Sequence, residues 1–260
     1  MIREKLIEKG IGNDHQFRWR SHEVSRTEGL SDAVFGFAIT LLVVSLEVPK
    51  TYAELMQTMR GFGAFAISFT LLFLVWYNQY KFFRRYGLQD NTTMVLNGIL
   101  LFVVIFYVYP LKFVFTLLVN QFSGGQGEFT QPNGSVGHMV ESSDQVARVM
   151  LIFGVGYVAV FGVFALLYGY AYRRRRDLEL NELEEFDTRV DISESLLNVL
   201  IGSVSILIAA VGGARFGPYG GFVYMACPLV LSIHGTMMGR KRRKLENDFD
   251  LARPGNPAIR

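Results

Sequence analysis

Lysines and arginines cluster in every other gap between the long apolar segments of this chain. Six such segments lie near residues 30–48, 61–80, 94–119, 149–172, 196–211 and 220–238, and a helix needs about 20 apolar residues to cross a bilayer. Basic clusters precede the first segment and follow the second, fourth and sixth, whereas the other gaps hold few basic residues. Because cytoplasmic loops carry the excess of positive charge, the pattern predicts an even number of crossings with both chain ends in the cytoplasm.

The predicted fold is therefore all-α: a polytopic membrane protein with six transmembrane helices and cytoplasmic N and C termini. We expect a cytoplasmic N-terminal segment over residues 1–25, a transmembrane domain over 26–244 and a cytoplasmic tail over 245–260. The acidic stretch 177–191 is expected to form a short cytoplasmic linker helix, and the polar stretch 121–145 an external loop. The expected location is the inner (plasma) membrane, with several passes.

Two polar residues, Ser31 and Asp32, open the first apolar segment. An ionisable side chain at the membrane boundary is costly to bury and usually faces the protein interior. Two interpretations remain open on this evidence. The pair could cap the start of the helix, where a carboxylate is favourable, or it could belong to a buried polar network.

An apolar stripe runs along the other half of the same predicted helix. At 100° per residue, Phe37, Leu41 and Val44 fall within about 60° of one another, and Thr40 stands at the edge of the stripe. Periodicity alone leaves open whether this stripe faces a pore, a partner helix or lipid.

The start of this segment resembles a known family. Arg26-x-x-x-Leu30-Ser31-Asp32, followed by Ala33-Val34-Phe35, is similar to the R-x-x-x-F-S-D signature of the transmembrane protein 175 family of lysosomal and prokaryotic potassium channels. The sequence departs from that pattern at Leu30, where the family has Phe, and at Phe37, where an aliphatic residue is expected. Trp76 matches in the second helix, but Asn78 or Gln79 stands in place of the histidines that tend to follow it.

The resemblance implies a homotetramer whose first helices line a potassium-selective pore without the usual T-V-G-Y-G filter. By position, Phe37, Leu41 and Val44 would form a hydrophobic constriction that gates by dewetting, and Thr40 would supply hydroxyl groups near it. The residues expected to hold the first helix to the rest of the subunit are Arg26, Ser31, Asp32, Trp76 and Asn97, with Asn97 a candidate partner for Ser31 or Asp32. Potassium is the expected permeant ion and lipid the expected surroundings, with no cofactor, bound metal or nucleic acid.

Several other features suggest weaker hypotheses. Gly154-Val155-Gly156-Tyr157 is similar to a potassium filter, but it lies inside a full-length apolar segment, where close helix packing explains small residues better. Lys112 is expected to extend toward the external interface, and His234 and Cys227 are expected to be packing residues.

Two other function classes compete with the channel. An ion- or proton-coupled secondary transporter would use Asp32, Lys112 and His234 as a relay, although the chain has no clear internal repeat. A structural membrane protein or a membrane enzyme is the third possibility, and too few ionisable residues lie in the apolar segments to favour an enzyme.

Overall fold

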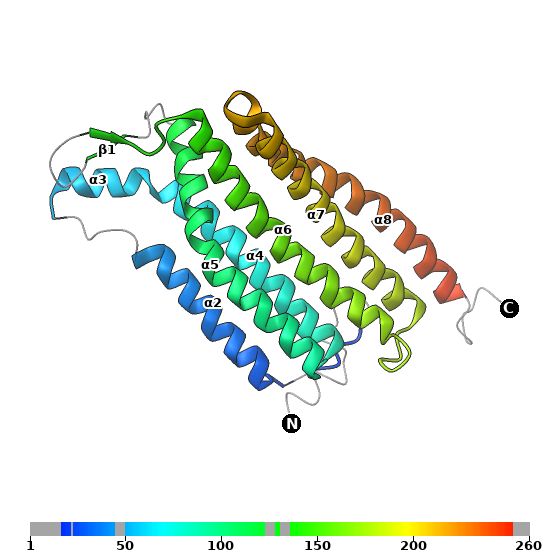
Figure 1. Ribbon diagram of the computed structural model, residues 1–260. Helices are drawn as coiled ribbons and strands as arrows, with labels where there is room; N and C mark the ends of the chain where they lie inside the picture. Colours follow the sequence, from blue (N-terminus) through cyan, green and yellow to red (C-terminus); the bar gives the residue numbers. More distant parts are fainter. Residues whose placement is uncertain (1–16, 22, 45–49, 123–127, 131–135, 252–260) are drawn as a thin grey trace.

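The computed structural model describes residues 17–21, 23–44, 50–122, 128–130 and 136–251 of the 260-residue chain. Long helices dominate it (Figure 1): α2 (Arg26–Val44), α4 (Phe62–Tyr86), α5 (Asn91–Phe122), α6 (Ser143–Arg173), α7 (Glu182–Phe216) and α8 (Ala226–Leu251). The shorter elements are α3 (Tyr52–Arg60), the 3-10 helix η1 (Gly217–Met225) and an antiparallel pair of strands, β1 (Glu128–Thr130) and β2 (Val136–His138).

Five of the described helical stretches are long and apolar enough to cross a membrane, and together they cover α4 to α8. The first long helix, α2, has 19 residues and is not among these five. It carries Arg26, Glu28 and Asp32 in its first two turns. The six long helices agree with the all-α class and the number of segments predicted from the sequence.

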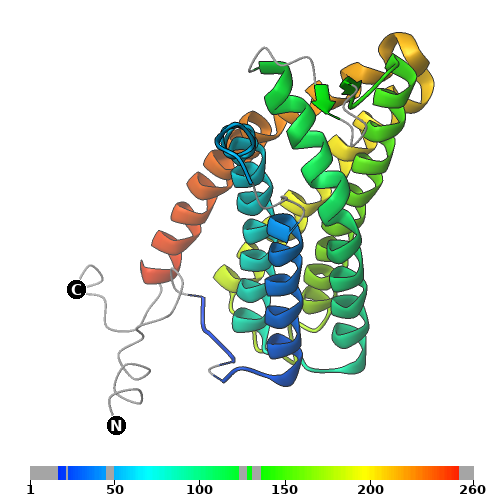
Figure 2. The ribbon, with the colours of Figure 1, turned by 90° about the vertical axis from the view of Figure 1, so that its left-hand side faces the viewer.

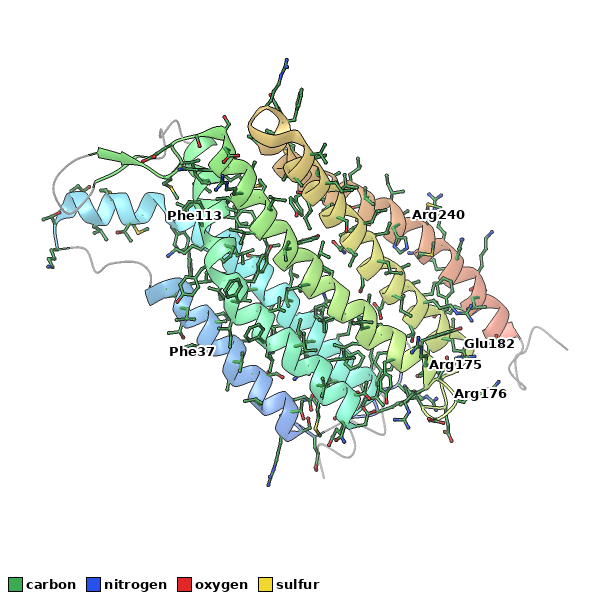
Figure 3. All side chains as sticks on the ribbon, viewed as in Figure 1. Phe37, Phe113, Arg175, Arg176, Glu182 and Arg240 are labelled. Carbon is green, nitrogen blue, oxygen red and sulfur yellow. The ribbon has the colours of Figure 1, made fainter. Side chains whose placement is uncertain are left out.

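Successive long helices run in opposite directions (Figures 1 and 2). As a result, the start of α2, the turn after α4, the turn after α6 and the start of α7 share one end of the bundle, where Figure 3 labels Arg175, Arg176 and Glu182. The short helix α3, the strands and η1 lie at the opposite end. The segments that the sequence shows to be rich in basic residues around residues 18–26, 81–85 and 173–176 therefore gather at one end.

The packing core is formed where α2, α4, α5 and α6 meet. Helix α2 packs against both α4 and α5, and α6 packs against α5 and α7. The side chains at the centre are almost completely buried, among them Phe35, Phe82, Leu100, Phe164 and Leu167. Burying large apolar side chains of this kind removes voids between helices, which matters in lipid because helix association there depends on close packing.

Helix α8 lies at the opposite margin from α2. It packs on α7 and η1, and Figure 2 shows it leaning away from the other helices. Its apolar side chains at Leu229, Ile233 and Met237 are exposed. An apolar face of this kind suits a bilayer or a neighbouring protein surface rather than water.

Two expectations about the helix boundaries are wrong. The acidic stretch 177–191 does not form a separate linker helix, because Asn181 and Glu184 make a capping box that starts α7, which continues to Phe216. Helix α8 likewise continues to Leu251, into the region expected to be a polar tail. The remainder of the tail, from residue 252, lies outside the described residues.

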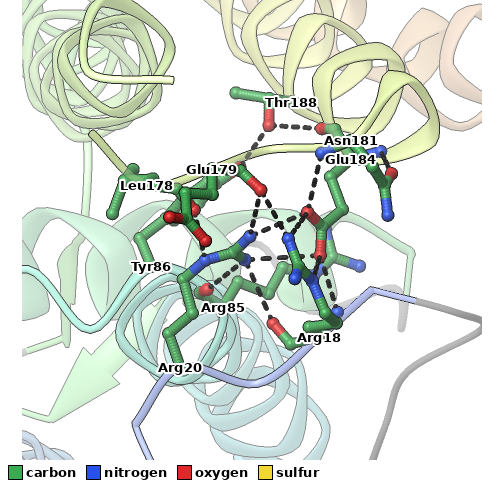
Figure 4. A network of polar contacts seen from close by, with 9 residues as sticks. All are labelled: Arg18, Arg20, Arg85, Tyr86, Leu178, Glu179, Asn181, Glu184 and Thr188. Carbon is green, nitrogen blue, oxygen red and sulfur yellow. Dashed lines mark hydrogen bonds and ion pairs between the residues drawn. The ribbon is translucent and has the colours of Figure 1, made fainter. Parts of the chain in front are cut away.

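A network of charged groups ties the segment before α2 to this end of the bundle (Figure 4). The buried carboxylate of Glu184 accepts hydrogen bonds from the backbone of Arg18 at 2.9 Å and from the guanidinium of Arg20 at 2.7 Å. Nearby, Arg85 donates to Asp191 at 2.8 Å. Paired and hydrogen-bonded charges are the form in which ionic groups tolerate burial. The basic cluster in the last turns of α4 is thus partly internal, since Arg84 and Arg85 are both buried.

Candidate functional site

Helix α2 begins with a capping box. The Ser25 hydroxyl accepts a hydrogen bond from the backbone of Glu28 at 3.1 Å, and the Glu28 carboxylate accepts one from the backbone of Ser25 at 2.8 Å. This reciprocal pair satisfies two backbone donors at the helix start. Ser31 and Asp32 lie more than a turn further on, so they do not cap the helix. The S-x-x-E spacing that signals this cap is present in the sequence.

Ser31 takes part in a buried chain of polar side chains. Its hydroxyl donates to the carbonyl of Thr27 at 2.8 Å and accepts a hydrogen bond from the amide of Asn97 on α5 at 3.0 Å. The carbonyl oxygen of Asn97 in turn accepts from Gln79 on α4 at 2.7 Å. Ser31, Asn97 and Gln79 are all buried. The chain links α2, α5 and α4 at one level of the bundle.

Asp32 makes a separate contact with α4. Its carboxylate accepts a hydrogen bond from the indole nitrogen of Trp76 at 2.8 Å. Arg26, by contrast, is exposed, and its side chain makes no hydrogen bond or ion pair with the described residues. Of the five residues expected to hold α2 in place, the structure brings together Ser31 with Asn97 and Asp32 with Trp76, and leaves Arg26 apart.

The opposite face of α2 is uncovered. Phe37 is 57% exposed, whereas Phe35 is 2% exposed and Ala38 and Leu42 are fully buried. Figure 3 labels Phe37 on α2, at the margin of the bundle.

Of the other two expected constriction residues, the structure describes the side chain of Leu41 but not that of Val44. Leu41 is half-buried. The backbone of Val44 closes α2, but its side chain lies outside the described residues. The exposed stripe thus contains Phe37, with Leu41 at its border.

Thr40 lies on the uncovered face, and its hydroxyl donates to the carbonyl of Gly36 at 2.9 Å. This intrahelical bond uses the one proton of the hydroxyl. The oxygen keeps acceptor capacity on the exposed side of the helix. Such an oxygen is suited to a cation rather than to a further acceptor.

The position of α2 determines what this face can do. Viewed along the line from α2 into the bundle, the helix lies in front of α4 and α5, with no other long helix outside it (Figure 2). In the part of one copy that the structure describes, the face of Phe37 and Thr40 therefore points outward, and no other long helix lies across from it. Any channel lined by this face needs further copies.

Lys112 on α5 contacts the far end of α2. Its ammonium group donates a hydrogen bond to the backbone carbonyl of Leu42 at 3.1 Å. The charged end of Lys112 thus contacts α2 within the subunit, and its expected reach toward the external interface stays a prediction. No spacing in the sequence signals this contact, because the two residues are far apart in the chain.

The residues of the hypothetical proton relay are not brought together. Asp32 contacts Trp76 and Lys112 contacts Leu42, whereas the imidazole of His234 on α8 lies 2.8 Å from the hydroxyl of Ser193 on α7. These are three separate places in the bundle.

The glycines of the filter-like stretch serve packing. A Cβ at Gly156 would lie 2.2 Å from the ring of Tyr107, and one at Gly154 would lie 2.6 Å from Ile206. Both distances are far below van der Waals contact, so only glycine allows these helices to approach so closely. The stretch lies in the interior of α6, as expected for a packing role.

Comparisons with known proteins agree with the resemblance of the first segment. Residues 26–107, from α2 into α5, match the family described as the endosomal/lysosomal potassium channel TMEM175. A potassium channel of Marivirga tractuosa is 37% identical over 248 residues, covering 94% of this chain and 99% of that protein. A potassium channel of Chamaesiphon minutus is 30% identical over 106 residues, covering 38% of this chain and 52% of that protein.

A solved structure is similar along most of the chain. It is the crystal structure of the T38A variant of the potassium channel MtTMEM175 in complex with a nanobody fusion protein. The two chains are 36% identical, with a TM-score of 0.74, and the match covers 88% of this chain and 100% of the other.

Proposed function

The chain belongs to the TMEM175 family of potassium channels, and from this premise we propose that α2 of each copy lines a potassium-conducting pore formed between copies. The observation that carries the proposal is the division of α2 into two faces. Phe35, Ala38 and Leu42 are buried against the subunit, while Phe37 and Thr40 are exposed along the opposite side.

A homotetramer is the proposed assembly. Closed rings of identical subunits place the same surface of each copy around one axis. Because α2 lies at the margin of the bundle (Figures 1 and 2), rotation about an axis beside it brings the α2 helices together. The exposed apolar face then lines an enclosed space.

Phe37, Leu41 and Val44 are proposed to form the constriction. Rings of apolar side chains exclude water from a narrow passage and so raise the free energy of an ion within it. The exposed ring of Phe37 is the bulkiest of the three. Leu41 lies at the border of the same face, where a small rotation of α2 changes how far it projects into the passage.

Thr40 is proposed to contribute to selectivity. Its hydroxyl proton is used within the helix, so the oxygen is available as an acceptor. A ring of such oxygens replaces part of the hydration shell of a cation. Weak neutral ligands favour K⁺, which is easier to dehydrate than Na⁺, and the expected preference is modest.

The end of the bundle where Arg18, Arg85 and Arg175 gather is proposed to face the cytoplasm, with both termini there and the protein in the plasma membrane. The clustering of basic residues at one end supports this orientation through the positive-inside rule. The proposed activity is transport, with K⁺ as the permeant ion, and requires no catalytic residue or cofactor.

Ion flux from purified protein in liposomes tests the proposal. Vesicles loaded with K⁺ are diluted into Na⁺ medium, and proton uptake driven by the resulting membrane potential is followed with a dye. We expect K⁺ efflux from the wild type and several-fold faster efflux from Leu41→Ala. Leu229→Ala, the same truncation at an exposed position on α8, is the control and is expected to match the wild type.

The same assay separates the channel from the transporter. Flux that appears only when a proton gradient is imposed would contradict a channel and favour coupled transport. Equal K⁺ flux from Leu41→Ala and the wild type would instead agree with a channel but contradict a constriction formed by α2.

A further inference from the structure

We propose that one face of α8 binds an anionic phospholipid. This face, the α8 stripe, consists of Ile233, Met237, Arg240 and Lys244, and all four side chains are exposed. At 100° per residue they fall within about 60° of one another around the helix. The lipid phosphate would bind at the two basic residues and the acyl chains would lie along the two apolar ones.

The opposite face of α8 packs on α7. The guanidinium of Arg242 donates a hydrogen bond to Asp187 at 2.8 Å, and the imidazole of His234 lies 2.8 Å from the hydroxyl of Ser193. These contacts turn the α8 stripe away from the subunit. None of the α8 side chains that the structure describes is buried, and Figure 3 labels Arg240 on this helix, at the margin of the bundle.

The basic part of the stripe lies at the end of the bundle that is proposed to face the cytoplasm. Asp187, the partner of Arg242, is one turn from Asp191 on α7, and Asp191 binds Arg85 in the basic cluster of α4. The apolar part of the stripe precedes the basic part along α8, which begins toward the opposite end of the bundle. The order from apolar to basic therefore matches the order from hydrocarbon to headgroup across one leaflet.

The cations of the stripe are not neutralised within the described part of the chain. Arg240 and Lys244 make no ion pair with a described residue, whereas the carboxylates of Asp187 and Glu246 both bind Arg242. Exposed cations at the membrane surface attract the negative phosphates of anionic lipids. The charge of the stripe is thus complementary to such a headgroup.

A lipid suits this face better than a second copy of the chain does. Two stripes that met at the same depth in one membrane would bring their basic halves together, and like charges in contact are unfavourable. The flanking residues Lys241 and Arg243 are also exposed and add to the positive charge. In the assembly proposed above, on which this step rests, α2 is at the centre, so α8 at the opposite margin lies on the outside of the ring (Figure 1).

Binding of a fluorescent lipid to the purified full-length protein tests the proposal. The protein in a non-ionic detergent is titrated into phosphatidylglycerol labelled on an acyl chain, and the fluorescence anisotropy is followed. We expect tighter binding than for phosphatidylcholine with the same label. Arg240→Gln/Lys244→Gln is expected to weaken phosphatidylglycerol binding about fivefold or more, because each basic residue near an anionic surface contributes about that factor.

The matched control removes the same charge elsewhere at this end of the bundle. Arg173→Gln/Arg176→Gln neutralises two exposed arginines at the end of α6 and is expected to bind the lipid as the wild type does. The exchange Arg240→Lys/Lys244→Arg keeps both charges and should also match the wild type. Equal weakening by the two neutralised pairs would overturn the proposal, because binding would then depend only on the overall charge of this end.

Two further measurements test the apolar half of the stripe. Met237→Ser is expected to weaken phosphatidylglycerol binding although it changes no charge. Glycerol phosphate has the same phosphate without acyl chains, and it should displace the labelled lipid much more weakly than unlabelled phosphatidylglycerol does. Equal displacement by the two, or equal binding of labelled phosphatidylcholine and phosphatidylglycerol, would contradict a site for an anionic lipid.

The lipid site and the proposed pore can fail separately, because anisotropy reports binding without any ion flux. Selective phosphatidylglycerol binding together with failure of the flux assay would leave the lipid site in place. Light scattering after size-exclusion chromatography tests the other occupant of the stripe. A smaller oligomer for Arg240→Gln/Lys244→Gln, with lipid binding unchanged, would assign the α8 stripe to a contact between copies and overturn the proposal.

Discussion

The carboxylate of Asp32 accepts a hydrogen bond from the indole nitrogen of Trp76 at 2.8 Å, which joins the proposed pore helix to α4 through side chains 44 residues apart in the sequence. The preceding residue of α2, Ser31, is bonded to α5 through Asn97. Consecutive residues thus fasten α2 to two different helices. The orientation of α2, and with it the face that is left uncovered, depends on this pair of contacts.

Replacing Asp32 tests that dependence. Asp32→Ala leaves the Trp76 N–H without its acceptor, and a hydrogen bond to a charged group contributes about 1.5–3 kcal/mol. We expect a smaller fraction of assembled oligomer by size-exclusion chromatography with light scattering. Asp32→Asn retains an acceptor and is expected to assemble nearly as well as the wild type. Normal assembly of Asp32→Ala with altered conductance would show that this residue acts in conduction instead.

Replacing Thr40 tests the proposed selectivity. Thr40→Val keeps the shape of the side chain and removes the oxygen that faces away from the subunit. We expect the preference for K⁺ over Na⁺ to fall several-fold, measured as a shift of the reversal potential toward zero in a K⁺/Na⁺ gradient. Thr70→Val, which removes another exposed hydroxyl bonded within its own helix on α4, is the control. An unchanged reversal potential for Thr40→Val would place selectivity elsewhere.

Replacing Glu184 tests the attachment of the segment before α2. The Glu184 side chain is 0% exposed and binds both Arg18 and Arg20. Removing one partner from a buried ionic contact leaves an uncompensated charge, at a cost of about 3 kcal/mol. We expect Glu184→Gln to unfold at a clearly lower temperature and to be cut faster by trypsin near Arg18. Glu185→Gln is the control, because Glu185 makes longer and more exposed ion pairs, and it should change the unfolding temperature and the cleavage rate little. Equal effects of Glu184→Gln and Glu185→Gln would contradict the proposed attachment through Glu184.

The lowered pKa of Asp90, in the turn between α4 and α5, predicts that the folded state loses stability in acid. Burial alone raises its pKa, but hydrogen bonds from Thr93 and Tyr170 and the charge of Arg174 outweigh this and hold the pKa below its ordinary value. A carboxylate whose pKa is lower in the folded state stabilises the fold above its unfolded pKa of about 4, and this contribution is lost as pH falls through the folded-state pKa.

The measurement is the unfolding temperature as a function of pH. Between about pH 5 and about pH 2 the wild type should lose stability more steeply than Asp90→Asn. Asp144→Asn removes a carboxylate from an exposed pair with Arg148 and is expected to keep the steep decline of the wild type. Parallel curves for the wild type and Asp90→Asn would contradict the assignment.

The topology could be predicted from the sequence because it depends on two properties that are local in the chain. Apolar length and the positions of basic residues determine how many helices cross and which gaps share an end. The division of α2 into two faces could also be predicted, since the 100° period separates Ser31 from Phe37 in any straight helix. The structure places these two residues on opposite sides, one buried and one exposed.

Contacts between distant segments could not be predicted in the same way. Nothing near Lys112 in the sequence indicates that its amine meets the carbonyl of Leu42, and nothing near Arg85 indicates that it is buried beside Asp191. Both depend on how helices lie against one another. The capping boxes at Ser25 and Asn181, by contrast, could be predicted, because each depends on a spacing of three residues in the sequence. At the start of α2, Ser31 and Asp32 are competing candidates for the cap.

The marginal position of α2 has a genetic consequence. Where every copy contributes one wall of the proposed passage, no copy conducts alone, and a faulty copy impairs the assembly that it joins. With equal amounts of normal and altered chains in a four-membered ring, only about one assembly in sixteen would be wholly normal. Alterations on the exposed face of α2 are therefore expected to be dominant in cells that express both forms, whereas alterations confined to the exposed margin at α8 are expected to be recessive.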